Sequence, residues 1–144
     1  MNGMATELIV RHRRSEREAA RILALANMAT SDALNACFDA KFAYYLIRPS
    51  QADPLITLPV GLPNHPSYPS GHSCLTSAFM TVVASEFPAE SATLKGLIEE
   101  AGLARMYSCL HYRFDCDAGQ TLGRDVANYL MSVTAGGNKL IPLD

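Results

Sequence analysis

Three short segments of the chain carry basic or imidazole side chains whose spacing suits a tetrahedral oxyanion. In the first, Lys41 and Arg48 lie seven residues apart. On a helix this spacing places both on one face, about 10.5 Å apart along the axis. Their long side chains could converge on one anion, because arginine offers a planar fork of donors and lysine a single charge. For this pair alone, two solvated surface cations are the alternative.

The second segment is Pro69-Ser70-Gly71-His72. Ser70 is a favourable helix N-cap, and Gly71 allows a ligand to approach the backbone closely. A helix that begins here directs free amides and its positive dipole end outward, which suits an anion. His72, on the first turn, could exchange a proton with that anion. The alternative is an ordinary helix start with an exposed histidine.

The third segment contains Arg105, His111 and Asp115. A carboxylate four residues after a histidine can accept a hydrogen bond from one ring nitrogen and leave the other nitrogen free. That arrangement makes a neutral histidine a directed nucleophile. A chance i, i+4 acid beside a histidine at a helix end is the alternative. The three segments together predict one shared site for a phosphate-like ligand between two histidines.

The order and spacing of these segments resemble the phosphatidic acid phosphatase type 2 (PAP2) superfamily, which also contains bacterial class A acid phosphatases and vanadium-dependent haloperoxidases. The family pattern is K-x6-RP, then PSGH, then SR-x5-H-x3-D. The chain reads Lys41-x6-Arg48-Pro49, Pro69-Ser70-Gly71-His72 and Ala104-Arg105-x5-His111-x3-Asp115. Ala104 thus replaces the family serine. The resemblance extends over residues 38–130.

The resemblance implies a phosphatase that hydrolyses phosphate monoesters through a phosphohistidine and needs no metal or other cofactor. His111 would be the nucleophile, Asp115 would orient it, and His72 would act as general acid and then as general base. The oxyanion of a small phosphorylated substrate would be held by Lys41, Arg48, Ser70, Gly71 and Arg105.

Two other functions stay open. A vanadium-dependent haloperoxidase would use the same residues for a vanadate cofactor, with His111 as the vanadium ligand. His65, five residues before Ser70, favours that branch because bromoperoxidase-type relatives also carry a histidine there, and Phe38 is a further possible pocket residue. The second alternative is a non-catalytic oxyanion-binding or assembly bundle. Because the chain is shorter at its N-terminus than soluble family members usually are, another subunit could supply the missing pocket wall, and we expect a homo-oligomer.

The hydrophobic pattern predicts helices and no strand. Ser15 and Glu18 form a capping box before a helix of about four turns, and residues 1–14 are expected to fray. A second helix is predicted from a cap at residues 30–32 to about Ile47, since Pro49 disfavours helical backbone at Arg48. These two helices could also be one kinked helix.

Residues 49–69 hold six of the eight prolines, which predicts a long irregular connection of the kind that often carries function. Helices are expected over 71–87, from a cap at Ser91, and over 117–135, where Gly136 and Gly137 end the last one. The fold class predicted is therefore an all-α bundle of about five helices, PAP2/haloperoxidase-like, in a single domain spanning residues 1–144.

Composition excludes several classes of function. The net charge of −2 gives no support for nucleic-acid binding. The basic run over residues 11–14 is interpreted as a solvated helix entry. Four cysteines without a CxxC pair predict buried, reduced thiols and no structural zinc. No stretch reaches the roughly 20 apolar residues of a membrane-spanning helix, so a cytoplasmic protein is expected.

Overall fold

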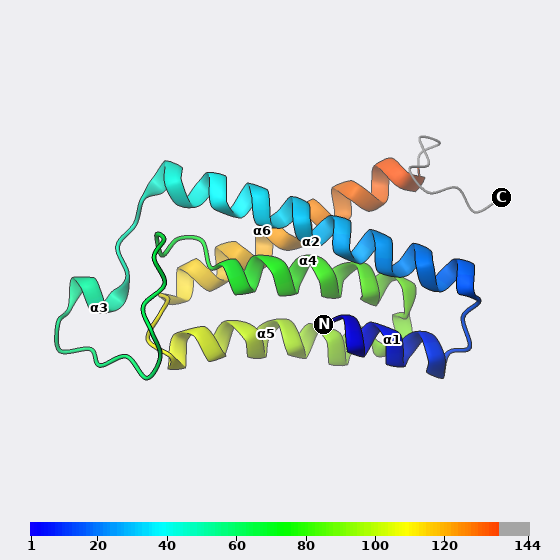
Figure 1. Cartoon of the computed structure of the whole chain (residues 1–144), viewed down its shortest axis with the longest axis horizontal. Coiled ribbons are helices and arrows are strands. Elements are labelled where there is room, and N and C mark those ends of the chain that lie inside the picture. Colours follow the sequence, from blue (N-terminus) through cyan, green and yellow to red (C-terminus); the bar gives the residue numbers. More distant parts are fainter. Residues whose placement is uncertain (136–144) are drawn as a thin grey trace.

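The helices form an elongated bundle with a long loop at one end (Figure 1). This computed structural model describes residues 1–135. Its elements are α1 (Asn2–Arg11), α2 (Glu16–Tyr44), α3 (Pro49–Ala52), α4 (Gly71–Glu86), a 3-10 turn (Pro88–Glu90), α5 (Ser91–Tyr107) and α6 (Arg113–Ala135). No strand occurs among the described residues. The predicted all-α class, with five long helices in the described part, is confirmed.

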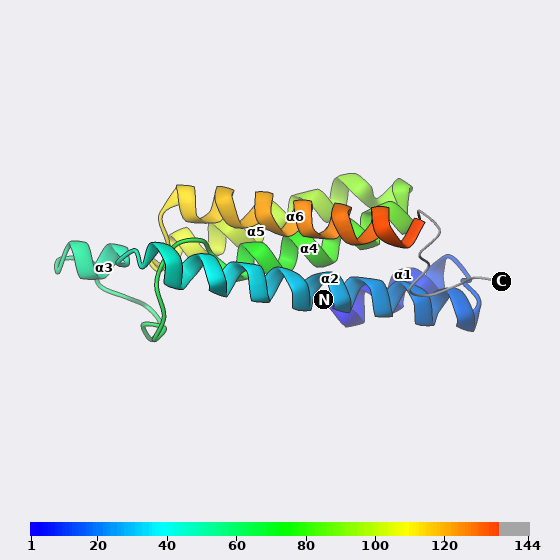
Figure 2. The same ribbon diagram turned by 90° about the horizontal axis from the view of Figure 1, so that it is seen from above.

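Helix α4 is the centre of the bundle and contacts α2, α5 and α6 (Figures 1 and 2). Its residues Phe79, Val82 and Val83 are buried, together with Leu25 of α2 and Leu94 of α5. Burying one such side chain stabilises a fold by about 1.5–3 kcal/mol. A helix that is apolar on most sides is stable only when other helices surround it, which explains the central place of α4.

Helix α2 is one continuous helix, as one of the two alternatives allowed. Ser15 and Glu18 form the predicted capping box, with the Ser15 N–H donating to the Glu18 carboxylate at 2.9 Å. The predicted cap at residues 30–32 is wrong. The Thr30 hydroxyl instead donates to the carbonyl of Ala26 at 2.7 Å, one turn back, so it does not cap a new helix. Ala33 is fully buried in the next turn, and packing carries the helix onward.

The N-terminal segment does not fray, contrary to the prediction for residues 1–14. Residues 2–11 form α1, and Ala5, Leu8 and Ile9 are buried in the core. A helix this short is marginal in water and depends on tertiary packing. The i, i+3, i+4 spacing of these three residues supplies the required apolar stripe, which is too short a pattern to predict a helix from the sequence.

Helix α6 begins at Arg113, four residues earlier than predicted. Its close packing on α4 depends on glycine, because a Cβ at Gly119 would lie 2.6 Å from the carbonyl oxygen of Ser70. The backbone of the same helix accepts a hydrogen bond of 2.9 Å from the Ser70 N–H to the Asp115 carbonyl. The beginnings of α4 and α6 are therefore held against each other, and both carry residues of the predicted site.

The predicted cap at Ser91 is wrong, because the 3-10 turn leads directly into α5 and makes Glu90 its N-cap and Ser91 its first residue. The predicted helix end at Gly136 and Gly137 lies outside the described residues. All four cysteines are free, and three of them are buried. Within residues 1–135, no helix is long and apolar enough to cross a membrane.

Candidate active site

The three motifs meet in one cavity of about 400 Å³ at the end of the bundle where α4 and α6 begin. The irregular loop between α3 and α4, which lies at this end of the bundle (Figure 1), contributes part of the lining. The cavity is lined by Leu34, Phe38, Arg48, Val60, Gly61, Pro63, His65, Gly71, His72, Leu75, Arg105, Leu110 and His111. Three further predicted residues lie directly behind this lining and are fully buried: Lys41, Ser70 and Asp115.

His111 is held in one defined tautomer. Its Nδ1 lies 3.0 Å from Asp115 Oδ2, and its Nε2 lies 3.3 Å from Nη1 of Arg48. Because a guanidinium group only donates, Nε2 must carry the lone pair and Nδ1 the proton. Burial lowers the pKa of His111, and the Asp115 hydrogen bond opposes that effect only in part. The ring is therefore neutral, with its lone pair directed at a cation of the cavity.

Asp115 lies on the first turn of α6 and is completely buried. Its Oδ2 accepts three hydrogen bonds: from His111, from the Tyr112 N–H at 3.1 Å and from the Ser67 hydroxyl at 2.5 Å. The i, i+4 spacing predicted the contact with His111. It did not predict Ser67, which belongs to none of the three motifs and has no periodic relation to Asp115.

Arg48 is 1% exposed, yet its acceptors are all neutral. Nε donates to the His65 carbonyl at 3.2 Å, Nη1 to the Leu110 carbonyl at 2.7 Å, and Nη2 lies 3.2 Å from His65 Nδ1. Burial lowers the pKa of the Arg48 guanidinium, while the nearby charge of Asp115 raises it. Arginine keeps its charge under such conditions. A buried cation thus points into the cavity beside the His111 nucleophile candidate.

The prediction that Lys41 and Arg48 share one helix face is wrong. Helix α2 ends at Tyr44, and Tyr45 adopts a left-handed conformation with φ of 51°. Arg48 has an extended backbone because Pro49 follows it, and it caps α3 instead of continuing α2. The two cations reach the site from different directions.

Lys41 approaches the site from beneath the loop. Its Nζ donates to the carbonyls of Pro66 and Ser67 at 2.7 and 2.9 Å, and it does not line the cavity. A Cβ at Gly71 would lie 3.9 Å from Lys41 Cε, which places the lysine under the start of α4. Burial lowers the pKa of Lys41. In this structure the lysine holds the loop in place, and its positive charge still acts on the site.

The start of α4 forms one wall of the cavity. The Ser70 hydroxyl accepts from the Ser73 N–H at 3.4 Å, so Ser70 is the predicted N-cap and its side chain is used there. Gly71 lines the cavity and His72 lies at its mouth, more exposed than His111. Burial lowers the pKa of His72, and the positive charge of Arg105 lowers it further.

Arg105, His65 and Phe38 complete the polar and aromatic lining. The side chain of Arg105, near the end of α5, has no hydrogen-bond or ion-pair partner among the described residues. The rings of His65 and Phe38, the two possible pocket residues, lie 5.2 Å apart and both face the cavity. Burial lowers the pKa of His65. No carboxylate belongs to the lining, so the described cavity is electropositive and suits an oxyanion.

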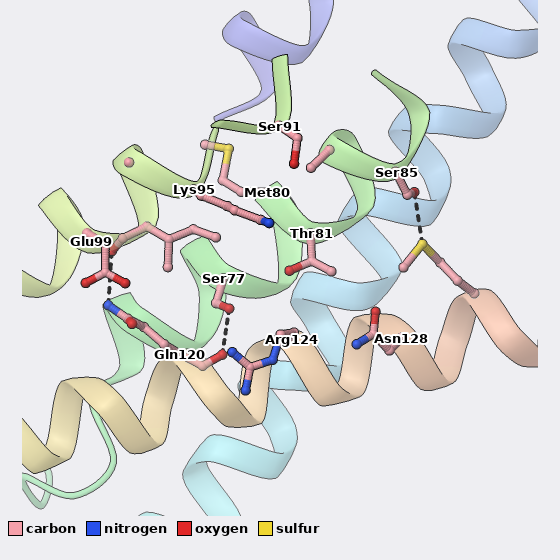
Figure 3. Close-up of a pocket in the computed structure, with 14 residues that line it drawn as sticks. Ser77, Met80, Thr81, Ser85, Ser91, Lys95, Glu99, Gln120, Arg124 and Asn128 are labelled. Atoms are coloured by element: carbon pink, nitrogen blue, oxygen red, sulfur yellow. Dashed lines mark hydrogen bonds between the residues drawn. The ribbon is translucent and has the colours of Figure 1, made fainter. Parts of the chain in front are cut away.

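A larger cavity of about 530 Å³ lies elsewhere, between α4, α5 and α6 (Figure 3). Figure 3 shows Lys95 and Glu99 on one side of it and Arg124 and Asn128 on the other. Charges of both signs meet there, and its lining contains no histidine or cysteine. Size alone would select this groove, but of the two only the smaller cavity combines a histidine positioned by a carboxylate, a second histidine and cations without carboxylate partners.

Comparison with known proteins gives a family match and a structural neighbour for the whole fold. The chain matches the sequence model of the PAP2 superfamily over residues 20–137. Among solved structures it is similar to a bacterial vanadium-dependent iodoperoxidase, with 25% sequence identity and a TM-score of 0.82. The alignment covers 91% of this chain and 37% of that one, so the chain spans little more than a third of its length. No curated protein matches the sequence.

Proposed function

The chain belongs to the PAP2 superfamily, and on this premise we propose that it hydrolyses phosphate monoesters through a phosphohistidine at His111. One observation carries the proposal: the Nε2 lone pair of His111 faces a cavity that contains cations but no carboxylate. A phosphate ester would be drawn to those cations and would present its phosphorus to a neutral nucleophile. Positioning and electrostatic stabilisation are the main demands of phosphoryl transfer.

Binding begins with an exchange of partners at Arg48. Nη1 contacts His111 Nε2 at 3.3 Å, so the lone pair is engaged until an anion arrives. A phosphate oxygen is a stronger acceptor for a guanidinium than an imidazole nitrogen, because hydrogen bonds between ionised groups are stronger than neutral ones. Arg48 would turn to the phosphate, together with Arg105 and the first amides of α4. Nε2 is then free to react.

In the first chemical step, Nε2 of His111 attacks phosphorus and the bond from phosphorus to the ester oxygen breaks. His72 gives its proton to that oxygen, so the alcohol leaves neutral. The imidazole of His111 becomes positive, and Asp115 stabilises that charge through the Nδ1–H hydrogen bond of 3.0 Å. In the second step water attacks phosphorus, His72 takes the proton from the water, and the phosphorus–nitrogen bond breaks. Both histidines return to their starting states.

A second candidate is a vanadium-dependent haloperoxidase, favoured by the iodoperoxidase neighbour. The donor set fits vanadate as well as phosphate: Arg48 and Arg105 for its oxygens, the amides of α4, and His111 Nε2 as a ligand. Bound vanadate would supply a Lewis-acidic centre that activates hydrogen peroxide towards halide. The protein's own contribution would be to hold the anion, keep Nε2 unprotonated and offer His72 as a proton donor.

The two candidates are separated by one set of assays on the purified protein. With a ³²P-labelled aryl phosphate, the phosphatase predicts release of phenol and a phosphoryl group that is stable in alkali, labile in acid and located on His111. Absence of both products contradicts the first candidate. Iodide oxidation by peroxide that requires added vanadate would then establish the second, and failure in both assays contradicts each of them.

A further inference from the structure

Ser67 makes a contact that the motifs do not account for. It is fully buried, and its hydroxyl donates to Asp115 Oδ2 at 2.5 Å while lying 3.4 Å from His111 Nδ1. The hydroxyl and the imidazole therefore share one carboxylate oxygen. The other oxygen of Asp115, Oδ1, is buried without a hydrogen-bond partner among residues 1–135. The donors are concentrated on the oxygen that serves His111.

The backbone of Ser67 is fixed on both sides. Its N–H donates to the Leu46 carbonyl at 2.8 Å, and its carbonyl accepts from Lys41 Nζ at 2.9 Å. A residue held at both its peptide groups cannot follow Asp115 if the carboxylate moves. Lys41, Ser67, Asp115 and His111 thus form a chain of contacts in which a buried ammonium group fixes the serine and the serine fixes the carboxylate.

We propose that Ser67 is a positioning residue that sets the strength of the hydrogen bond between Asp115 and His111. Only the expected change in catalysis rests on the proposed function. The expected change in the pKa of His111 holds for any reaction at this site. Ser67 touches neither substrate nor the reacting atoms. It acts by occupying part of the acceptor capacity of Oδ2.

The direction of the effect follows from charge. The Ser67 hydroxyl stabilises the negative charge of Asp115, so less of that charge is available to His111. Removing the hydroxyl leaves His111 and the Tyr112 amide as the donors to Oδ2. The carboxylate then stabilises the imidazolium form more strongly, and the pKa of His111 rises. A serine with a merely structural role would not move the titration of one histidine.

The experiment is an NMR titration of the histidine rings in wild type, Ser67→Ala and Ser77→Ala. Ser77 is the matched control, because its buried hydroxyl also donates a short hydrogen bond, 2.6 Å to the Gln120 carbonyl, away from the site. In Ser67→Ala, we expect a roughly three- to tenfold higher proton affinity of His111, the range of one lost hydrogen bond. His72 should titrate as in wild type, and Ser77→Ala should leave both histidines unchanged.

An unchanged His111 in folded Ser67→Ala overturns the proposal. If that variant does not fold, Ser67→Cys replaces it, since a thiol has similar size but donates weakly. A smaller rise is then expected, and no rise overturns the proposal equally. In aryl phosphate hydrolysis, the acidic limb of the kcat/KM profile should shift to higher pH by the same factor. A His111 that shifts in a protein without phosphatase activity would support the role of Ser67 and contradict the proposed function.

Discussion

The two ends of the bundle both carry clusters of basic side chains. These side chains are paired with carboxylates at one end and have only neutral partners at the other. At the end formed by α1 and the start of α2 (Figure 1), the cations meet carboxylates: Arg11 and His12 lie 3.5 and 3.4 Å from Glu90, and Arg21 lies 2.5 Å from Glu86. At the site end, Lys41 and Arg48 are buried and contact only carbonyls and ring nitrogens.

This difference separates cations that carboxylates neutralise from cations that have no carboxylate partner. Partly exposed ion pairs such as Arg21–Glu86 are worth about 0–1 kcal/mol and leave little net field. A buried cation without a carboxylate partner destabilises the fold, since its lost hydration is not replaced by an opposite charge. Neither Lys41 nor Arg48 forms an ion pair within the described chain. Their arrangement is understandable if an anion completes it.

Replacing a histidine at each end gives the largest expected contrast. His111→Ala removes the proposed nucleophile, and we expect kcat/KM for p-nitrophenyl phosphate to fall at least about 10⁴-fold, as for other enzymes that lose the group forming the covalent intermediate. His12→Ala removes only a contact with Glu90 and a ring contact with Phe87, and its activity should equal that of wild type. Comparable losses in both variants would mean that His111 acts through folding alone.

Replacing an arginine at each end separates binding of the anion from stability. Arg48→Met should lower kcat/KM by about 10²- to 10³-fold, the range for loss of one donor to a developing oxyanion. Inorganic phosphate should raise the Tm of wild type and of Arg21→Met, but not of Arg48→Met. Arg21→Met loses a surface pair, so its free energy of unfolding should change by at most about 1 kcal/mol. Phosphate stabilisation that survives Arg48→Met would contradict the assignment.

The pH dependence of kcat/KM gives a smaller effect, whose direction follows from the pKa shifts of His111 and His72. The reactive enzyme needs His111 without its extra proton and His72 with one. Because burial lowers the pKa of both histidines, kcat/KM should be highest below pH 6.5, the ordinary histidine pKa. It should fall roughly tenfold for each pH unit above the pKa of His72. Profiles must be corrected for ionisation of the substrate, and an optimum above neutrality would contradict the assigned roles.

Replacing Arg105 tests directly whether the pKa of His72 sets the alkaline limb of the pH profile. The positive charge of Arg105 lowers the pKa of His72, so Arg105→Met should move the alkaline limb of the profile to higher pH. Arg124→Met is the matched control, because Arg124 lines the other groove (Figure 3) and is not among the groups that shift the pKa of His72. A limb that moves equally in both variants would show that net charge, and not the position of Arg105, sets it.

The sequence predicted which residues come together at the site better than it predicted how they are arranged. The His111–Asp115 pair was predictable because i, i+4 spacing is a local property that the start of α6 preserves. The shared helix face of Lys41 and Arg48 was not, since the left-handed Tyr45 ends α2 before Arg48 is reached. A helix end of this kind is decided by the packing of the following loop. Sequence period does not encode it.

Residues outside the motifs were missed for a related reason. Ser67 acquires its role only when the loop before α4 folds against α6, a contact between positions 48 residues apart. The same holds for Gly119. This position must be glycine because the backbone of Ser70, at the start of another helix, leaves no room for a side chain. The helix at residues 2–11 was missed because three buried residues make a short pattern. Local patterns predicted most of the helices. Their positions relative to one another depend on contacts between distant residues, which local patterns do not contain.

The smallest expected effect is a preference for certain alcohol groups of the ester. It depends on the polarity of the cavity lining and not on its charge. Besides its arginines and histidines, the described lining is carbon-rich: Leu34, Phe38, Val60, Pro63, Leu75 and Leu110. It contains no serine, threonine, asparagine, glutamine or carboxylate side chain to receive the hydroxyl groups of a polyol. Hydroxyls buried there would lose water without gaining partners, which costs free energy.

An aryl phosphate should therefore have a kcat/KM roughly tenfold above that of glycerol phosphate after allowance for their different leaving groups, since modest apolar contacts discriminate by about that factor. Phe38→Ser places a hydroxyl in the wall and should reduce the preference severalfold, mainly through a higher KM for the aryl ester. The glycerol ester serves as the internal control, because its rate should not fall. A variant that slows both esters equally would show that Phe38 supports the ring of His65, 5.2 Å away, and does not contact the alcohol.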